Sequence, residues 1–295
     1  MQDVSVHRSS ANEPSGSDRP LPMAMWVDGS LVSPNDHVLR PDDHCLVGDG
    51  VFEAIKVLDG RPFALTRHLR RLVASASPLG IDIDLDVVQT AVDDLMATEQ
   101  AQVSPSWLRI TVTGGSTPMG TGAVGTRPTV VAAVAPMAPW GPTTDVVIAP
   151  WTRNERGPTA GLKTISYADN IIALRHAHRC GADEAIFANT RGELCEGTGT
   201  NVVVAHEGRL VTPTLASGCL AGVTRELLLE WFPEIVEADL PISALAEADE
   251  AFLTSTSRDV HPIRRVDGKE LTAAPGPLTR RAMTAWAENH PVLSA

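Results

Sequence analysis

The chain has 295 residues, 43% of them hydrophobic, and a formal net charge of −12 at pH 7. This length and composition allow one large or two modest globular domains. The acidic balance argues against nucleic acid or an anionic membrane as the main partner, because either polyanion would be repelled.

The composition also indicates where in the cell this protein is expected. Residues 1–22 are polar and rich in serine, proline and glycine, which predicts a disordered tail. No apolar stretch follows the start and no run of eighteen apolar residues occurs, so we expect neither export nor a membrane span. The four cysteines lack the spacing of a zinc site or a disulfide framework, and a reducing cytoplasm fits them best.

Strand and helix signals follow this tail. Asp28-Gly29 predicts a tight turn between two short strands, and alternation in residues 51–58 places Phe52 and Lys56 on one face of a strand and Glu53 on the other. The expected elements in chain order are a hairpin at 24–32, a strand at 51–58, helices from about 67 to 78 and at 85–99, and strands at 107–113 and 129–134. They predict a small N-terminal α/β domain at residues 23–137.

The chain then becomes rich in proline. Three prolines within residues 136–142 predict a stiff connector, so we place a domain boundary there, with the connector at 138–144 and a larger domain at 145–295. The elements expected beyond it are strands at 146–149, 184–188, 200–204 and 251–254, and helices at 167–180 and 224–231.

Only three of the 24 basic residues are lysines: Lys56, Lys163 and Lys269. Arginine supplies surface charge equally well, but only lysine can lose its proton when desolvated and attack a carbonyl to form a Schiff base. Lys269 follows an Asp-Gly turn and is expected in an exposed hairpin. Lys56 has two interpretations, a rim charge or a contact to a substrate carboxylate. Lys163 is therefore the candidate nucleophile.

Two further segments suit a lysine that forms a Schiff base. Glu196 opens a small-residue turn before an apolar strand, where a carboxylate can keep a pyridine nitrogen protonated. A glutamate in a surface hairpin is the alternative. A glycine-punctuated loop at 217–222 leads into a helix whose first amides, at Val223 and Thr224, can bind a phosphate, although simple helix capping explains the same pattern.

Two other segments offer donors for that phosphate. Residues 254–257 are four consecutive hydroxyl residues at a strand end, which is also ordinary turn chemistry. Arg70 and Arg71 lie on the first expected helix, where either could bind a phosphate or serve as surface charge. The set of amine, carboxylate, helix N-terminus, hydroxyls and arginine is more specific than any one part.

These segments resemble the fold-type IV family of pyridoxal-phosphate enzymes, which contains branched-chain and D-amino-acid aminotransferases, (R)-amine transaminases and aminodeoxychorismate lyases. The matching segments, in order, are residues 48–53 (GDGVFE), 68–72 (HLRRL), 162–164 (LKT), 196–202 (EGTGTNV), 220–225 (LAGVTR) and 254–256 (TST) with Pro262 beyond. The resemblance implies an α+β fold with a small N-terminal domain and a larger C-terminal domain with a β-barrel-like core. It also implies a homodimer, in which a loop of the second subunit completes the site.

The resemblance assigns a role to each matching residue. Lys163 is similar to the lysine that carries pyridoxal 5′-phosphate as an aldimine and shuttles the proton, and Glu196 to the partner of the pyridinium nitrogen. Arg71, rather than Arg70, aligns with the phosphate arginine. The other implied cofactor contacts are Thr200, Leu220, Val223, Thr224 and Thr256.

The substrate side departs from the known subfamilies. Residues 112–115 read V-T-G-G, where D-amino-acid aminotransferases carry V-T-R-G with an arginine for the substrate carboxylate. The position of a branched-chain-enzyme arginine is held by Lys56. The candidate substrate contacts are Phe52, Lys56, Arg153, Arg156 and Ser255, with Arg258 as a further cation.

We expect a transaminase that moves an amino group between a D-amino acid, or an (R)-primary amine, and a 2-keto acid. One alternative is an aminodeoxychorismate lyase that releases pyruvate and p-aminobenzoate. Another is a branched-chain L-amino-acid aminotransferase. A noncatalytic pyridoxal-phosphate carrier is disfavoured, because it would not need the Glu196 electron sink.

Overall fold

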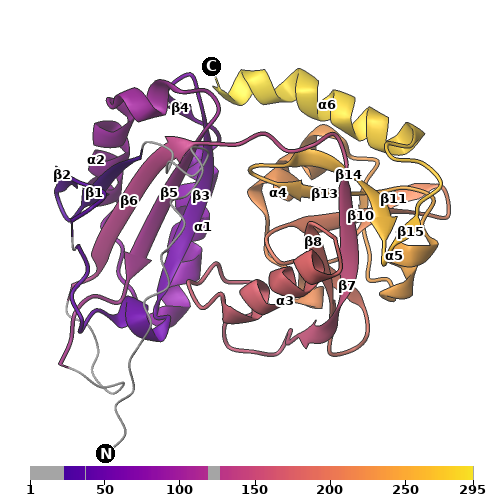
Figure 1. Ribbon diagram of the computed structural model, residues 1–295, viewed down its shortest axis with the longest axis horizontal. Coiled ribbons are helices and arrows are strands. Elements are labelled where there is room, and N and C mark those ends of the chain that lie inside the picture. The colour runs from indigo at the N-terminus through magenta and orange to yellow at the C-terminus, as the bar shows by residue number, and fades with distance from the viewer. Residues whose placement is uncertain (1–22, 37, 119–126, 295) are drawn as a thin grey trace, which may run out of the picture.

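The computed structural model describes residues 23–36, 38–118 and 127–294, so the tail expected at residues 1–22 lies outside the described residues. The described chain forms two β-sheets, each with its own helices (Figure 1). It passes from the first sheet to the second through residues 137–143. None of the described helices has the length and apolar character needed to cross a membrane.

The first sheet has six antiparallel strands in the order β2-β1-β6-β5-β3-β4. Their bounds are β1 Ala24–Val27, β2 Ser30–Val32, β3 Gly50–Leu58, β4 Arg61–Pro62, β5 Ser106–Thr113 and β6 Thr129–Pro136. The hairpin and the three longer strands predicted here are confirmed. Asp28 and Gly29 both have positive φ, 41° and 111°, which explains the Asp-Gly pair at the β1–β2 turn.

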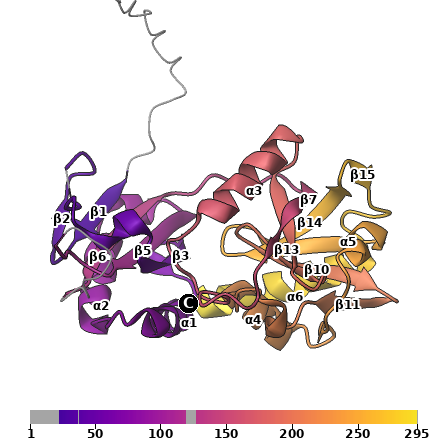
Figure 2. The same ribbon diagram turned by 90° about the horizontal axis from the view of Figure 1, so that it is seen from below.

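Helices α1 (Leu65–Ala76) and α2 (Leu85–Met96) cover one face of this sheet (Figure 2). Asp84 caps α2 by accepting hydrogen bonds from the amides of Asp86 and Val87. The prediction that this helix continues to residue 99 is wrong. The hydroxyl of Thr98 donates to the carbonyl of Leu95 at 2.6 Å and closes the last turn.

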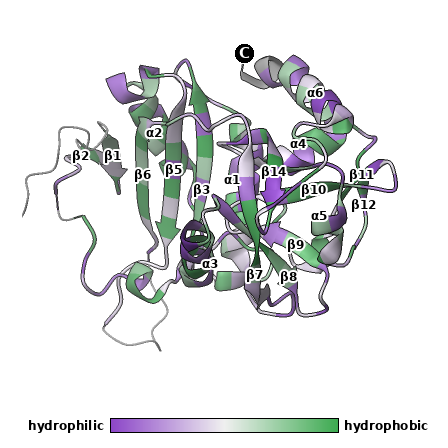
Figure 3. Cartoon of the chain, turned by 45° about the vertical axis from the view of Figure 1, so that its right-hand side comes forward, coloured by the Kyte–Doolittle hydropathy of each residue, from purple (hydrophilic) through white to green (hydrophobic). Residues whose placement is uncertain are grey.

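Strand β3 separates the core of the first sheet from the second sheet. Its odd-numbered side chains, including Val51 and Ile55, are fully buried under the helices. Its even-numbered side chains face the other way, and the Lys56 ammonium lies 2.5 Å from the carboxylate of Asp259. The alternation predicted from the sequence is confirmed, and Figure 3 shows mainly apolar residues along β3, β5 and β6.

The second sheet has nine strands in the order β12-β11-β10-β13-β14-β7-β8-β9, with β15 on the edge of β14. Their bounds are β7 Thr144–Arg153, β8 Glu184–Asn189, β9 Leu194–Gly197, β10 Asn201–His206, β11 Arg209–Thr212, β12 Val236–Glu237, β13 Ala251–Ser255, β14 Asp259–Val266 and β15 Lys269–Glu270. The sheet is mixed, with β7 parallel to both neighbours, and it curls into a partial barrel (Figure 1). This is the expected α+β fold, and the expected hairpin with exposed Lys269 is present.

Four helices accompany the second sheet: α3 Ala168–Arg179, α4 Val223–Trp231, α5 Ser243–Glu247 and α6 Pro277–Ser294. The helices predicted at 167–180 and 224–231 are confirmed as α3 and α4. Helix α6, yellow in Figure 1, packs Trp286 against the core around α4 and reaches toward the first sheet. Phe63, which follows β4, is buried in that same core, so the two halves share packing.

Candidate active site

A cavity of about 360 Å³ lies where α1 meets the second sheet, and Lys163 lines it. Its size is within the range of small-molecule sites, roughly 300 to 1,000 Å³. The predicted residues that line the cavity are Arg71, Arg153, Lys163, Glu196, Thr200, Leu220, Val223, Thr224, Ser255 and Thr256. Residues predicted from segments far apart in the sequence therefore line one cavity.

The backbone of Lys163 is held by the first half of the molecule. The amide of Phe52 donates to the carbonyl of Lys163 at 3.0 Å, and the amide of Ile165 donates to Gly50 at 2.9 Å. The Lys163 amide donates to the hydroxyl of Ser75 at 3.1 Å. Strand β3 and helix α1 thus fix the lysine in position.

The side chain of Lys163 lies against an aromatic ring. Its ammonium nitrogen is 4.3 Å from the ring centroid of Phe52. Burial, helped by the positive charge of Arg71, lowers the pKa of Lys163 from 10.5 to about 8. With this pKa about a tenth of the amine is unprotonated at pH 7, far more than for an ordinary lysine, and the unprotonated amine is the nucleophile.

Glu196 is held from two sides. One carboxylate oxygen accepts the amide of Leu220 at 2.8 Å, and the other lies 3.1 Å from Nε of Arg153. Burial raises the pKa of Glu196, and the charge of Arg153 opposes that shift. Arg153 also donates to the side-chain carbonyl of Asn170 at 3.0 Å. The structure therefore pairs Arg153 with Glu196, whereas the sequence suggested a contact to substrate.

The opposite end of the cavity is suited to an oxyanion. Helix α4 follows Gly222, which has no side chain to cap the helix, so the amides of Val223 and Thr224 lack a side-chain acceptor. Such amides and the helix dipole favour a bound anion. Arg71 reaches the same loop, donating from Nη1 to the carbonyl of Ala221 at 2.9 Å. Arg70 is exposed and does not line the cavity.

Two buried threonines differ from the sequence-based expectation. The hydroxyl of Thr200 lies 3.3 Å from Glu184, to which it donates, so it supports the 197–200 turn rather than pointing freely at a ligand. Thr254 belongs to the 254–257 hydroxyl segment offered as phosphate donors, although only Ser255 and Thr256 of that segment were singled out as contacts. Thr254 is among the residues that line the cavity, and its hydroxyl is buried with no hydrogen-bond partner among the described residues. An unsatisfied buried hydroxyl costs about 1–3 kcal/mol, which a ligand acceptor or donor would recover.

Three expected substrate cations lie away from the cavity. Lys56 is neutralised by Asp259 and does not line it. The side chain of Arg156 is 78% exposed to solvent. Arg258 is buried beside the 137–143 connector and donates to the hydroxyl of Thr144 at 3.2 Å. As substrate contacts these three residues stay predictions, and in the structure their side chains face partners distant in sequence, or solvent.

Two residues that contact the Phe52 ring were missed. Tyr167, the one tyrosine of the chain, lines the cavity and packs edge-on against Phe52 with centroids 5.3 Å apart. Burial raises its pKa. The guanidinium of Arg109 lies 4.2 Å from the same Phe52 centroid, and no described carboxylate forms an ion pair with it. Its position between buried Leu108 and Ile110 on β5 was the available signal, since alternation puts it on the Phe52 face.

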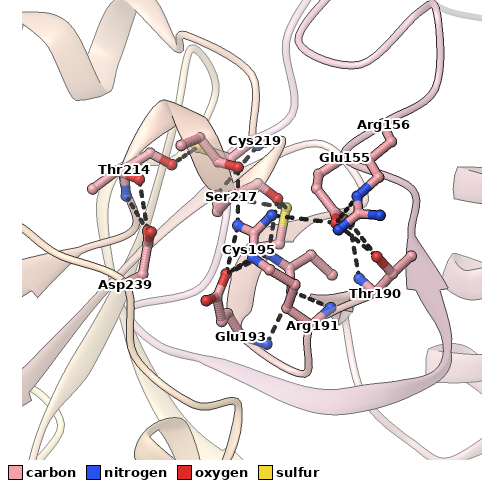
Figure 4. Close-up of polar contacts among 12 residues, drawn as sticks. Glu155, Arg156, Thr190, Arg191, Glu193, Cys195, Thr214, Ser217, Cys219 and Asp239 are labelled. Atoms are coloured by element: carbon pink, nitrogen blue, oxygen red, sulfur yellow. Dashed lines mark hydrogen bonds and ion pairs between the residues drawn. The ribbon is translucent and has the colours of Figure 1, made fainter.

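A polar cluster supports the cavity wall from outside (Figure 4). Glu155, in the loop before Lys163, accepts hydrogen bonds from the amide of Thr190 at 3.0 Å and from its hydroxyl. Those bonds, with the nearby charge of Arg191, lower the pKa of Glu155 to about 2. Arg191 in turn pairs with Glu193 at 2.6 Å. The loop is thereby fastened to the β8–β9 turn.

Comparison with known proteins gives this site a family. The family model described as amino-transferase class IV matches residues 50–266. The chain belongs to the class IV aminotransferases. This class IV aminotransferase is 30% identical over 285 residues to the branched-chain-amino-acid aminotransferase of Pseudomonas aeruginosa, covering 89% of this chain and 91% of the relative. It is also 30% identical over 272 residues to the D-alanine aminotransferase of Bacillus licheniformis, covering 89% and 95%.

A solved structure supports the cofactor assignment. A hypothetical aminotransferase from Mycobacterium tuberculosis, in its PLP-bound form, superimposes with a TM-score of 0.79 at 26% identity, covering 90% of this chain and 98% of that one. Class IV aminotransferases use pyridoxal 5′-phosphate. The residues of this cavity fit that group, with an amine at Lys163, a carboxylate at Glu196, open amides at α4 and an unpartnered hydroxyl at Thr254.

Proposed function

We propose that this class IV aminotransferase moves an amino group between an α-amino acid and a 2-keto acid, with Arg109 holding the substrate carboxylate. The observation that carries the proposal is the shared position of two groups on one ring. Lys163 Nζ and the Arg109 guanidinium lie 4.3 Å and 4.2 Å from the Phe52 centroid. An α-amino acid carries its amine and carboxylate on one carbon, so the proposal requires both groups to lie on the same side of the ring and requires the substrate to reach Arg109, which does not line the cavity, past Phe52.

The residues of the site then have separate tasks. Bound pyridoxal 5′-phosphate supplies the carbonyl that takes the amino group and the ring that accepts electrons from the substrate carbon. Lys163 Nζ, with its pKa lowered to about 8, would remove the proton from the substrate Cα and deliver it to the cofactor carbon that carries the transferred nitrogen. Glu196, fixed by the amide of Leu220, holds a proton on the ring nitrogen. The α4 amides and Arg71 bind the phosphate.

Which amino acid and which enantiomer the enzyme uses is a separate question. The two relatives are named for branched-chain amino acids and D-alanine, and both kinds of substrate carry an α-carboxylate. This common feature supports a carboxylate site but favours neither enantiomer. The D-amino acid expected from the sequence stays a prediction, as do the (R)-amine and lyase alternatives.

The half-reaction tests the proposal. The holoenzyme is mixed with D-alanine, L-leucine or (R)-1-phenylethylamine, and conversion of bound pyridoxal phosphate to pyridoxamine phosphate is followed by absorbance. We expect conversion with at least one amino acid. Arg109→Ala should reduce kcat/KM for that amino acid about 10- to 100-fold, because a charged hydrogen bond contributes about 1.5–3 kcal/mol.

The control is Arg109→Lys, which retains the positive charge and should lose less. The amine without a carboxylate should react equally with wild type and Arg109→Ala. Two outcomes would refute the carboxylate site. In one, the wild type converts (R)-1-phenylethylamine but neither amino acid, and in the other, Arg109→Ala leaves the rate with the amino acid unchanged. Release of pyruvate from aminodeoxychorismate without any half-reaction would favour the lyase.

The homodimer implied by the resemblance is part of the same proposal. Leu46 and Val47 are 67% and 61% exposed, and the next residue, Gly48, accepts a hydrogen bond from Ser166 at the cavity. Exposed apolar pairs beside a site favour a protein interface. Sedimentation velocity would test it, and a monomer at working concentration would oppose it. A cytoplasmic location stays an expectation.

A further inference from the structure

Glu53 is a charged residue at the centre of the first half with no place in the mechanism above. Its side chain is fully buried on β3, and it does not line the cavity. Its two oxygens accept from Nε and Nη2 of Arg71 at 2.8 and 2.7 Å. Nδ1 of His68 lies 2.7 Å from the second oxygen. Burying a carboxylate is unfavourable unless such partners compensate it.

The ionised state of Glu53 is well supported by these partners. Burial alone would raise its pKa, but the hydrogen bonds and charge of Arg71, together with His68, lower the pKa to about 2. Glu53 therefore carries a full negative charge at neutral pH. A two-point pairing of this kind fixes the plane of a guanidinium.

Arg71 is held from the second half as well. Its Nη1 donates to the carbonyl of Ala221, in the loop that leads into α4. A guanidinium has five N–H groups. Three of those in Arg71 serve Glu53 and Ala221, which leaves one on Nη1 and one on Nη2 for another acceptor. Because Arg71 lines the cavity and its fork cannot rotate, the direction of these free donors is set by Glu53.

We infer that Glu53 is a positioning residue for the cofactor phosphate, acting through Arg71. It holds the guanidinium so that the free N–H groups meet an oxyanion seated on the first amides of α4. His68 steadies Glu53 from the other side. This role concerns retention of the cofactor and does not depend on which substrate the enzyme uses or on Arg109.

A merely structural ion pair makes a different prediction. If Glu53 only stabilised the first half, its loss would weaken the binding of every ligand of the cavity by the same factor. If it acts through Arg71 on the phosphate, its loss weakens ligands that carry a phosphate and spares those that lack one. Pyridoxal 5′-phosphate and pyridoxal differ in that group alone, so their relative affinity separates the two roles.

The experiment titrates apoenzyme with each compound and follows tryptophan fluorescence. Glu53→Gln should weaken the binding of pyridoxal 5′-phosphate about 10- to 100-fold, which is the range for residues that support the groups around a bound ion. The affinity for pyridoxal should change by less than about two-fold. The matched control is Asp94→Asn, which removes the charge of another carboxylate of the first half, one that accepts a hydrogen bond from the indole of Trp26. It should alter neither affinity. Equal weakening of both compounds by Glu53→Gln, or no weakening, would overturn the inference.

Two further variants keep the test decisive. Glu53→Asp retains the buried charge and folds more readily, but it draws the carboxylate back from Arg71, so a smaller phosphate-specific loss is expected. In Arg71→Ala, adding Glu53→Gln should cause no further loss of phosphate discrimination, because the two residues act as one unit. Additive losses in the double variant would contradict action through Arg71.

Discussion

The ionisation of one amine governs how this enzyme can hold its cofactor. Burial and the charge of Arg71 lower the pKa of Lys163 to about 8. In apoenzyme, labelling of Lys163 by trace reductive methylation should therefore rise through a midpoint near pH 8. Arg71→Met should move this midpoint upward, since it removes a positive charge. Peptide mass spectrometry follows each of the three lysines separately.

The exposed Lys269 is the internal control for that measurement, because its labelling reports an amine in contact with solvent. If Lys163 and Lys269 were labelled in parallel at every pH, the perturbation of Lys163 would be disproved. An unchanged midpoint in Arg71→Met would rule out Arg71 as a cause and leave burial and the charge of Arg109.

Because the hydroxyl of Thr254 has no partner among the described residues, removing it should raise apoenzyme stability and lower cofactor affinity. Thr254→Val removes a buried polar group that no described residue satisfies, so apoenzyme should become more stable by about 1 kcal/mol. The same change should weaken cofactor binding if the hydroxyl turns toward a ligand in the cavity that Thr254 helps to line. Urea unfolding of apoenzyme and cofactor titration measure the two effects. Thr254→Ser keeps the hydroxyl and should preserve cofactor affinity, and loss of apoenzyme stability in Thr254→Val would contradict the interpretation.

The residue types in the site were more predictable than their pairings. Lys163, Glu196 and Arg71 could be singled out because each brings a distinct chemistry within a recognisable motif. The partner of Lys56 could not, since Asp259 lies 203 positions away and only the fold brings them together. The pairing of Arg153 with Glu196 could not be predicted either, because it depends on how β7 and β9 lie on either side of β8.

At the scale of elements, the loop before Lys163 depends on Glu155. Its pKa is lowered from 4.5 to about 2 by the hydrogen bonds of Thr190, so its stabilising effect is present above pH 4.5 and is lost as pH falls toward 2. Glu155→Gln should lower the Tm at pH 7. The difference from wild type should shrink as the pH falls through this window, because the Glu155 carboxyl of the unfolded state takes up a proton first and favours unfolding of the wild type.

Thermal melts from pH 7 to pH 3 measure this difference. The control is Glu288→Gln, at an exposed position of α6, which should change the Tm little at any pH. A Glu155→Gln deficit that stayed constant down to pH 3 would show that the carboxylate charge is not responsible.

Elements with strong local signals were predictable, and those made by packing were not. The β1–β2 hairpin follows from Asp28-Gly29, and α2 begins where Asp84 caps it. Helix α6 was missed because polar and apolar residues are mixed along its sequence without a strong local helix signal. It is stabilised by tertiary contacts, chiefly the burial of Trp286 against the α4 core, rather than by local propensity.

At the scale of the whole molecule, the cavity exists because the two halves are fastened together. Strand β3 holds the backbone of Lys163, and Arg71 on α1 reaches the loop before α4. The sequence predicted two units joined by a connector, but the contacts between them depend on the folded arrangement. The site therefore should be sensitive to changes at the junction that touch no site residue.

Phe63 gives the sharpest test of this dependence. It follows β4 of the first sheet, is 4% exposed, and packs with Val223 and Leu227 of α4 in the core of the second half. Phe63→Ala should reduce the free energy of unfolding by about 3–5 kcal/mol through lost burial and a residual cavity. It should also weaken cofactor binding, because α4 supplies the open amides at the phosphate end.

Urea unfolding and cofactor titration together measure this coupling. The matched control is Val73→Ala on α1, at a position 38% exposed, where a change within about 0.5 kcal/mol is expected. If Phe63→Ala lowered stability but left cofactor affinity at the wild-type value, the packing of the two halves would not control the phosphate end. If it weakened both, a side chain from the first sheet would be setting the position of the helix N-terminus in the second.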